Sequence, residues 1–192
     1  MAQLEPLDPL AGTLGKQVAA LQMVEKGLKG DVPILQTIFS PLTTARKLAG
    51  ERMFADLRAH PIAFKLGLQV IAETTACFAL GCAEAGAHGL FIAMQCATNQ
   101  LLNEAEYREF GEPFDRLVLE TVRPQTSLNI AHIHGDDIFF DLVSDYQVEA
   151  INWHDRITSP GLAEARQRFS GMLVGGINEW KIPKGPDVIH PG

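Results

Sequence analysis

The sequence predicts an α/β fold of the parallel (β/α)8 TIM-barrel type that is incomplete, with about five of the eight strands present. Short apolar runs alternate with helical patterns along the whole chain, which is typical of parallel βαβ units. No strand candidate leads into a Gly-x-Gly-x-x-Gly turn, which an open dinucleotide-binding sheet would usually carry. Polar residues collect where the strand candidates end, and the carboxyl ends of barrel strands carry the chemistry.

The strand candidates are apolar runs that cover residues 32–40, 89–95, 128–134, 148–154 and 172–177. Apolar spacing predicts long helices over 12–28, 61–85 and 103–122, the last broken near Gly111 and Pro113, and short helices over 41–48, 51–59, 138–143 and 162–169. Gly30 and Asp31 end the first helix. Ser40 and Pro41 begin the second, because proline suits the first turn of a helix.

Composition limits the function. The 192 residues are 46% hydrophobic and 20% charged, as in one soluble domain. The net charge is −7 and no Lys/Arg run exceeds two residues, so we expect no nucleic-acid partner. Cys77, Cys82 and Cys96 form no CxxC pair, which indicates a reducing, cytoplasmic location. No signal peptide and no apolar run of about 18 residues is found, so we expect no membrane partner.

A closed barrel of this type needs eight strands and roughly 250 residues. We therefore expect residues 1–192 to form one partial (β/α) barrel domain that lacks the amino-terminal and final carboxyl-terminal parts of the fold. Five strands cannot close, so the outer strands would expose backbone groups and apolar faces. We expect a homodimer, or pairing with the missing barrel segments, to cover them. Residues 184–187 look like the entry to a further helix.

The most informative segment contains His132 and His134. Residues two apart on a strand point to the same face, so the two imidazoles could bind one metal or pair as proton donor and acceptor. Alternatively, one is a hydrogen-bonded barrel residue and only the other meets a ligand. Asp136 could orient an imidazole, or either Asp136 or Asp137 could cap the following helix. We predict catalytic roles for His132, His134 and Asp136.

The next strand candidate ends in His154 and Arg156. His154 could supply a third metal ligand or a general acid, and Arg156 could hold a substrate carboxylate with two hydrogen bonds. The alternatives are a local Asp155–Arg156 salt bridge and a Trp153 side chain that packs under the helices.

Other strand ends carry further candidates. Ser40 and Thr43 offer hydroxyls at a helix start, as an anion cradle or a simple cap. Cys96 would be reactive if exposed, and Asn178 follows two glycines that leave room for a ligand. We expect one concave mouth to collect Ser40, Gln95, His132, His134, His154 and Asn178.

Five segments resemble the uroporphyrinogen decarboxylase family in order and spacing: SPLTTARKLAG (40–50), LNEAEYREFGEPF (102–114), HIHGDD (132–137), INWHDR (151–156) and LVGGIN (173–178). The resemblance covers about residues 30–180. That family includes the decarboxylases of haem biosynthesis and zinc-dependent methyltransferases that act on corrinoid proteins or thiol coenzymes. The resemblance implies an enzyme that acts on a tetrapyrrole-type substrate without a cofactor, or a methyltransferase with zinc.

The family patterns also imply roles for single residues. Pro41 and Thr43 match the decarboxylase pattern, Lys47 stands where it has a substrate-contacting Tyr, and Cys96 stands where it has a Ser. Together with the strand-end candidates Ser40, Gln95, Arg156 and Asn178, the matched positions Thr43 and Cys96 complete the predicted substrate-binding set.

The methyltransferases carry a His-x-Cys zinc pair, which here reads His132-Ile133-His134. Their third ligand, a Cys, would lie beyond Gly192, so His154 or Asp136 would complete the set. A hypothesis of another class is a non-catalytic, truncated barrel that folds with a partner.

Overall fold

The computed structural model describes residues 4–28 and 30–178, and its five strands form one parallel sheet in the order β1-β2-β3-β4-β5. The strands are β1 (Leu35–Phe39), β2 (Gly89–Met94), β3 (Ile130–Ile133), β4 (Ala150–Trp153) and β5 (Met172–Val174). The strands follow one another in sequence order, with no reversal of the kind found in a doubly wound sheet. The α/β fold with an incomplete parallel barrel is therefore confirmed.

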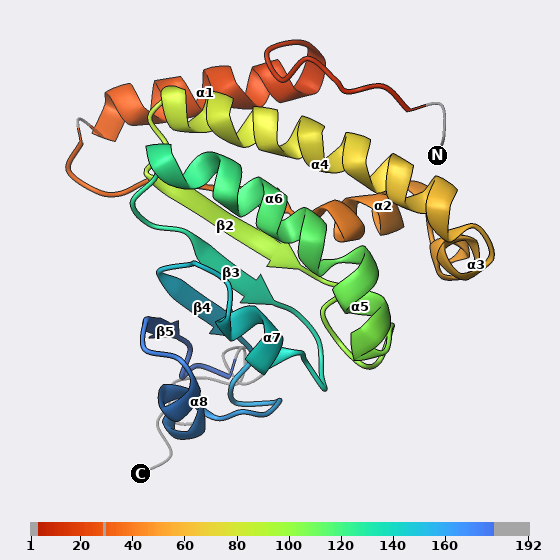
Figure 1. Cartoon of the computed structure of the whole chain (residues 1–192). Helices are drawn as coiled ribbons and strands as arrows, with labels where there is room; N and C mark the ends of the chain where they lie inside the picture. The colour runs from red at the N-terminus through yellow and green to blue at the C-terminus, as the bar shows by residue number, and fades with distance from the viewer. Residues whose placement is uncertain (1–3, 29, 179–192) are drawn as a thin grey trace.

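Helices connect the strands. They are α1 (Gly12–Leu28), α2 (Pro41–Ala49), α3 (Arg52–Ala59), α4 (Pro61–Glu84), α5 (Glu104–Phe110), α6 (Glu112–Val122), a 3-10 turn (Arg123–Gln125), α7 (Phe140–Ser144) and α8 (Leu162–Arg168). Figure 1 shows α1, α4 and α6 on the same side of the sheet. Every predicted helix and strand is present within the described residues. The strands are shorter than predicted because a strand extends only as far as it pairs with the backbone of its neighbour. For example, β1 is limited to the five residues that pair with Gly89–Ala93.

Local capping explains two helix starts. The Ser40 hydroxyl accepts a hydrogen bond from the Thr43 backbone N–H, which begins α2 as predicted. Asn103 and Glu106 form a reciprocal capping box at the start of α5. The capping role predicted for Asp136 or Asp137 is wrong, because α7 begins after Phe139 without a side-chain cap.

Helix α4 is long and apolar enough to span a membrane by length and composition alone. Here it packs against α6 and α1, and buries Phe64, Leu68 and Ile71. Phe64 meets Phe110 of α5 edge to face, with ring centroids 5.9 Å apart. One side of α4 therefore belongs to the core, whereas Ile62 and Leu66 of the same helix are exposed.

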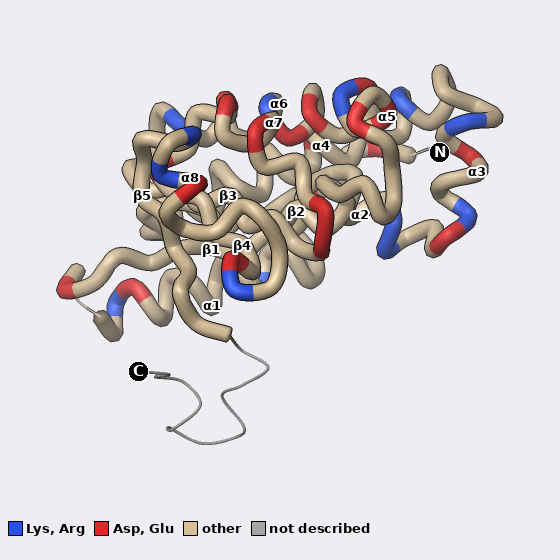
Figure 2. The backbone as a smooth tube through the Cα atoms, turned by 90° about the horizontal axis from the view of Figure 1, so that it is seen from below, with Lys and Arg blue, Asp and Glu red and all other residues tan. Residues whose placement is uncertain are grey.

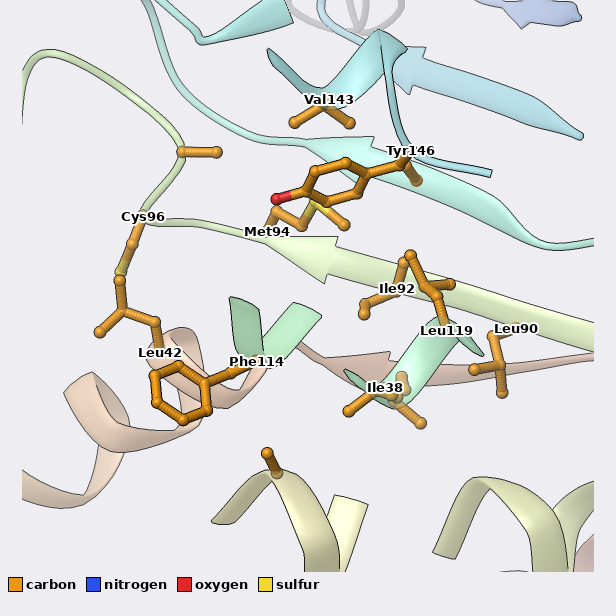
Figure 3. Packing of buried hydrophobic residues seen from close by; sticks show 14 of the residues in the cluster. Ile38, Leu42, Leu90, Ile92, Met94, Cys96, Phe114, Leu119, Val143 and Tyr146 are labelled. Atoms are coloured by element: carbon orange, nitrogen blue, oxygen red, sulfur yellow. The ribbon is translucent and has the colours of Figure 1, made fainter. Parts of the chain in front are cut away.

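The two faces of the sheet differ. The face under the helices buries Ile38, Ile92, Ile133 and Ile151, and Figure 3 shows the first two within the core cluster. The opposite face would be the inside of a complete barrel, and no Lys, Arg, Asp or Glu lies in any of the five strands (Figure 2).

On that open face, Phe39 is 39% exposed, Met172 56% and Val174 36%. This apolar exposure is what an incomplete barrel predicts. The homodimer, or the pairing with further barrel segments, stays a prediction.

Candidate functional site

The candidate site lies on the open face of the sheet, at the carboxyl ends of β3 and β4. The parallel register places Ala93, His132, Asn152 and Val174 side by side on four neighbouring strands. Because Ile133 and Trp153 point into the helix-covered core, the alternation of a strand directs His132 and Asn152 to the open face. His134 and His154 occupy the next positions of the same alternation, directly beyond the two strands.

The structure brings His132, His134 and His154 together. One nitrogen from each ring belongs to a set whose members all lie within 4.8 Å of one another. The His154 Nε2 and His134 Nδ1 atoms are 3.2 Å apart. The ring centroids are separated by 5.1 to 5.9 Å. His134 is exposed and the other two are half-buried, so the cluster is open to a ligand from the solvent side.

Two neighbours hold the His132 ring. Its Nδ1 lies 2.6 Å from Asn152 Oδ1, and Asn152 Nδ2 donates to the Val174 carbonyl at 2.7 Å. The Phe91 ring stacks on the imidazole at 5.2 Å with an interplanar angle of 24°. The sequence analysis assigned no role to Asn152 or Phe91. The sequence signal that could have identified Asn152 is its position in the strand candidate that follows the one carrying His132, on the same face as that histidine.

Asp155 connects this site to β5. It is 9% exposed, and its Oδ1 accepts a hydrogen bond from the Gly176 backbone N–H at 2.7 Å. Among the described residues no ion pair joins Asp155 to Arg156, which is exposed, so the alternative of a local salt bridge is not supported. A Cβ on Gly175 would lie 2.4 Å from the same carboxylate oxygen, so a glycine is required for this close approach.

Trp153 packs under the helices as expected. Its ring meets Phe140 edge to face at 4.9 Å, and its Nε1 donates to the Pro160 carbonyl at 2.8 Å.

Asp136 lies apart from the histidines. It lines a separate cleft of about 580 Å³ between α5, α7 and α8, where Gln100 Nε2 donates to its carboxylate at 3.4 Å. None of its oxygens belongs to the ligand set found among the described residues. The structure thus gives no support to Asp136 as a partner of the imidazoles, because the turn at Gly135, with φ of 108°, carries the chain away.

Three predicted substrate-binding side chains are buried by packing. Ser40 and Cys96 are 0% exposed and Thr43 is 1% exposed. The Thr43 hydroxyl bonds to Ser40 and also accepts from the Gln95 backbone N–H at 2.9 Å. Burial raises the pKa of the Cys96 thiol to about 11, and Figure 3 shows this residue among the core side chains. In this structure the Ser40 and Thr43 hydroxyls support the segment that follows β2, and none of the three side chains is exposed. Their contact with a substrate stays a prediction.

Gln95 and Asn178 are half-buried, and their contact with a substrate stays a prediction. The proposed helix entry at 184–187 lies outside the described residues.

Comparisons with known proteins identify the family and support the fold. The family model described as uroporphyrinogen decarboxylase (URO-D) matches residues 1–189. A methylated-thiol–coenzyme M methyltransferase of Methanosarcina mazei is 30% identical over 127 residues, which are 65% of this chain and 34% of that protein. A solved methyltransferase from Methanosarcina mazei superposes with a TM-score of 0.80 at 21% identity, over 94% of this chain and 54% of that one. The chain therefore spans about a third of the length of the first protein and about half of the second.

Proposed function

The chain belongs to the uroporphyrinogen decarboxylase family, and on that premise we propose that it serves zinc-dependent methyl transfer involving a thiol or a corrinoid-linked methyl group. The observation that carries the proposal is the cluster of His132, His134 and His154 at the carboxyl ends of β3 and β4. The relative with 30% identity is named as a methyltransferase that acts on methylated thiols and coenzyme M, which supports thiol chemistry.

The donor set fits zinc. Catalytic zinc sites commonly use three protein ligands and keep a fourth position for water or substrate. With Zn–N distances of about 2.0–2.1 Å, two nitrogens on a tetrahedral ion lie about 3.3 Å apart. The 3.2 Å between His134 Nδ1 and His154 Nε2 matches that separation. His132 would be the third ligand, so that His154 completes the set and Asp136 is not needed.

The residues around the cluster suit a thiol substrate. Zinc bound at this cluster would hold a coordinated thiol as the thiolate, which is the nucleophilic form. The exposed edge of His134 lets a substrate reach the cluster from solvent. On the protein side, the half-buried Phe91 ring stacks on the His132 imidazole.

The test has a metal part and an activity part. We expect the full chain, purified without chelators, to contain about one equivalent of zinc, and His154→Ala to contain much less. His60→Ala, which changes the residue between α3 and α4, is the control and should bind zinc normally. Methyl transfer from methylcobalamin to a small thiol should follow the zinc content. Wild-type protein with well under one equivalent of zinc would overturn the proposal.

Assays on the same protein distinguish the two other hypotheses, a decarboxylase and a non-catalytic barrel. Release of carbon dioxide from a uroporphyrinogen without zinc would favour the decarboxylase, which the family match also supports. Absence of zinc and of both activities would favour the non-catalytic barrel.

A further inference from the structure

We propose that Asn152 is a positioning residue that fixes the ring orientation and the tautomer of His132, so that Nε2 is the nitrogen presented to a ligand. Asn152 stands opposite His132 in the parallel register and opposite Val174 on its other side. It bonds to both neighbours, at 2.6 Å and 2.7 Å. One side chain thus links three adjacent strands across the open face.

The Val174 contact determines which way the amide points. The Val174 carbonyl can only accept a hydrogen bond, so it must face the Asn152 NH2 group, which can only donate. The opposite orientation would bring two oxygens together at 2.7 Å. Asn152 Oδ1 is therefore the atom that faces the imidazole.

The orientation of the amide in turn determines the tautomer of His132. Asn152 Oδ1 can only accept, so at 2.6 Å the His132 Nδ1 must carry the proton. The neutral imidazole then has its lone pair on Nε2, which is the form that binds a metal or accepts a proton. Phe91 stacks on one side of the ring and restricts its rotation.

A histidine that binds a metal usually donates its second N–H to an acceptor that sets its tautomer. In this site the acceptor is the side-chain amide of Asn152. Its second hydrogen bond, to the Val174 carbonyl, connects the histidine to the end of β5. The zinc part of this inference rests on the proposed function, whereas the tautomer part depends on the hydrogen bonds alone.

Nuclear magnetic resonance tests the tautomer without metal. Long-range ¹H–¹⁵N correlation spectra of the metal-free full chain, with labelled histidines, show which ring nitrogen carries the proton. His132→Gln identifies the signals of His132. We expect the proton on Nδ1 in the wild type and on Nε2, or on both nitrogens in exchange, in Asn152→Leu. A wild-type His132 with its proton on Nε2 would overturn the proposal.

Zinc affinity gives the second readout, measured by competition with a chromophoric chelator. We expect Asn152→Leu to weaken zinc binding by about 10–100-fold. Val174→Ala keeps the carbonyl acceptor and is the matched control, with wild-type affinity. Equal zinc affinity in the wild type and Asn152→Leu would overturn the proposal.

The Asn152→Asp variant tests whether Asn152 positions His132 or only supports the fold. It also replaces Asn152→Leu in this test if the leucine variant does not fold. A carboxylate still accepts from His132 Nδ1 but cannot donate to Val174. We expect it to keep the Nδ1-protonated tautomer and to restore most of the zinc affinity. Loss of that tautomer in Asn152→Asp would contradict the acceptor role. A wild type that keeps the tautomer but binds no zinc would support the role of Asn152 and refute the proposed function.

Discussion

A buried carboxyl in α6 makes the stability of this protein depend on pH in an unusual direction. Asp115 is 0% exposed. The Tyr107 and Tyr146 hydroxyls donate to its Oδ2 at 2.5 Å and 3.4 Å, whereas Oδ1 has no partner among the described residues. Burial raises the pKa of Asp115 from 3.8 to about 7, although the hydrogen bonds from the two tyrosines lower it. Figure 3 shows Tyr146 beside the core residues of β2.

Proton linkage determines whether the free energy of unfolding rises or falls with pH. Because the pKa of Asp115 is higher in the folded protein than in the unfolded chain, the native state holds an extra proton between about pH 4 and pH 7. The stabilising contribution is therefore present at low pH and is lost as the pH rises through 7. One pKa unit corresponds to about 1.4 kcal/mol, so from pH 5 to pH 8 this group should remove about 3 kcal/mol from the free energy of unfolding.

Urea unfolding of the wild type and Asp115→Asn at pH 5 to 8 tests this value. The amide can still accept from the tyrosines, but its NH2 group replaces Oδ1 and lacks an acceptor, at a cost of about 1–3 kcal/mol at every pH. The variant should be less stable at pH 5, and the difference should vanish or reverse by pH 8. Asp145→Asn removes an exposed carboxylate and controls for the change in net charge. Parallel pH profiles for the wild type and Asp115→Asn would refute the argument.

Two further predictions concern packing. In the native protein a thiol reagent should modify Cys77, which is exposed. Cys82 and Cys96 should stay unmodified, because both are buried and burial raises the pKa of each thiol to about 11. Rapid modification of all three thiols before unfolding would contradict this. Gly89→Ala should lower the free energy of unfolding by at least about 1–3 kcal/mol, because the new Cβ would lie 1.7 Å from the Leu128 carbonyl oxygen. Gly27→Ala, in an open part of α1, is the control, and its melting temperature should not fall.

Much of the fold could be read from residue patterns because those patterns act locally. Short apolar runs located β2 and β4, and helical spacing located α4 and α1, since each pattern depends only on the residues of its own element. The proline at the start of α2 and the glycine between α5 and α6 also act within one turn of the chain. Strand ends were less accurate because they depend on where the neighbouring strand stops.

The candidate site was predicted only in part. The pair His132 and His134 follows from the two-residue repeat of a strand, and the prediction that His154 lies nearby follows from adjacent parallel strands. Asp136 was predicted beside the imidazoles but lines a separate cleft, because Gly135, with a positive φ, turns the chain out of the sheet just before it. The burial of Cys96 was also missed, since position after a strand does not reveal which way a side chain points.

By itself the sequence determined the kind of elements and their order, because periodicity is a property of the chain alone, and the resemblance of five segments pointed to the family. Only the tertiary structure decided which face of the sheet the helices cover and which side chains of the other face stay exposed, since exposure depends on what covers a surface. It also decided that Asn152 lies between His132 and the Val174 carbonyl. That contact depends on the register of three strands, which is set by backbone hydrogen bonds between segments that are distant in the sequence.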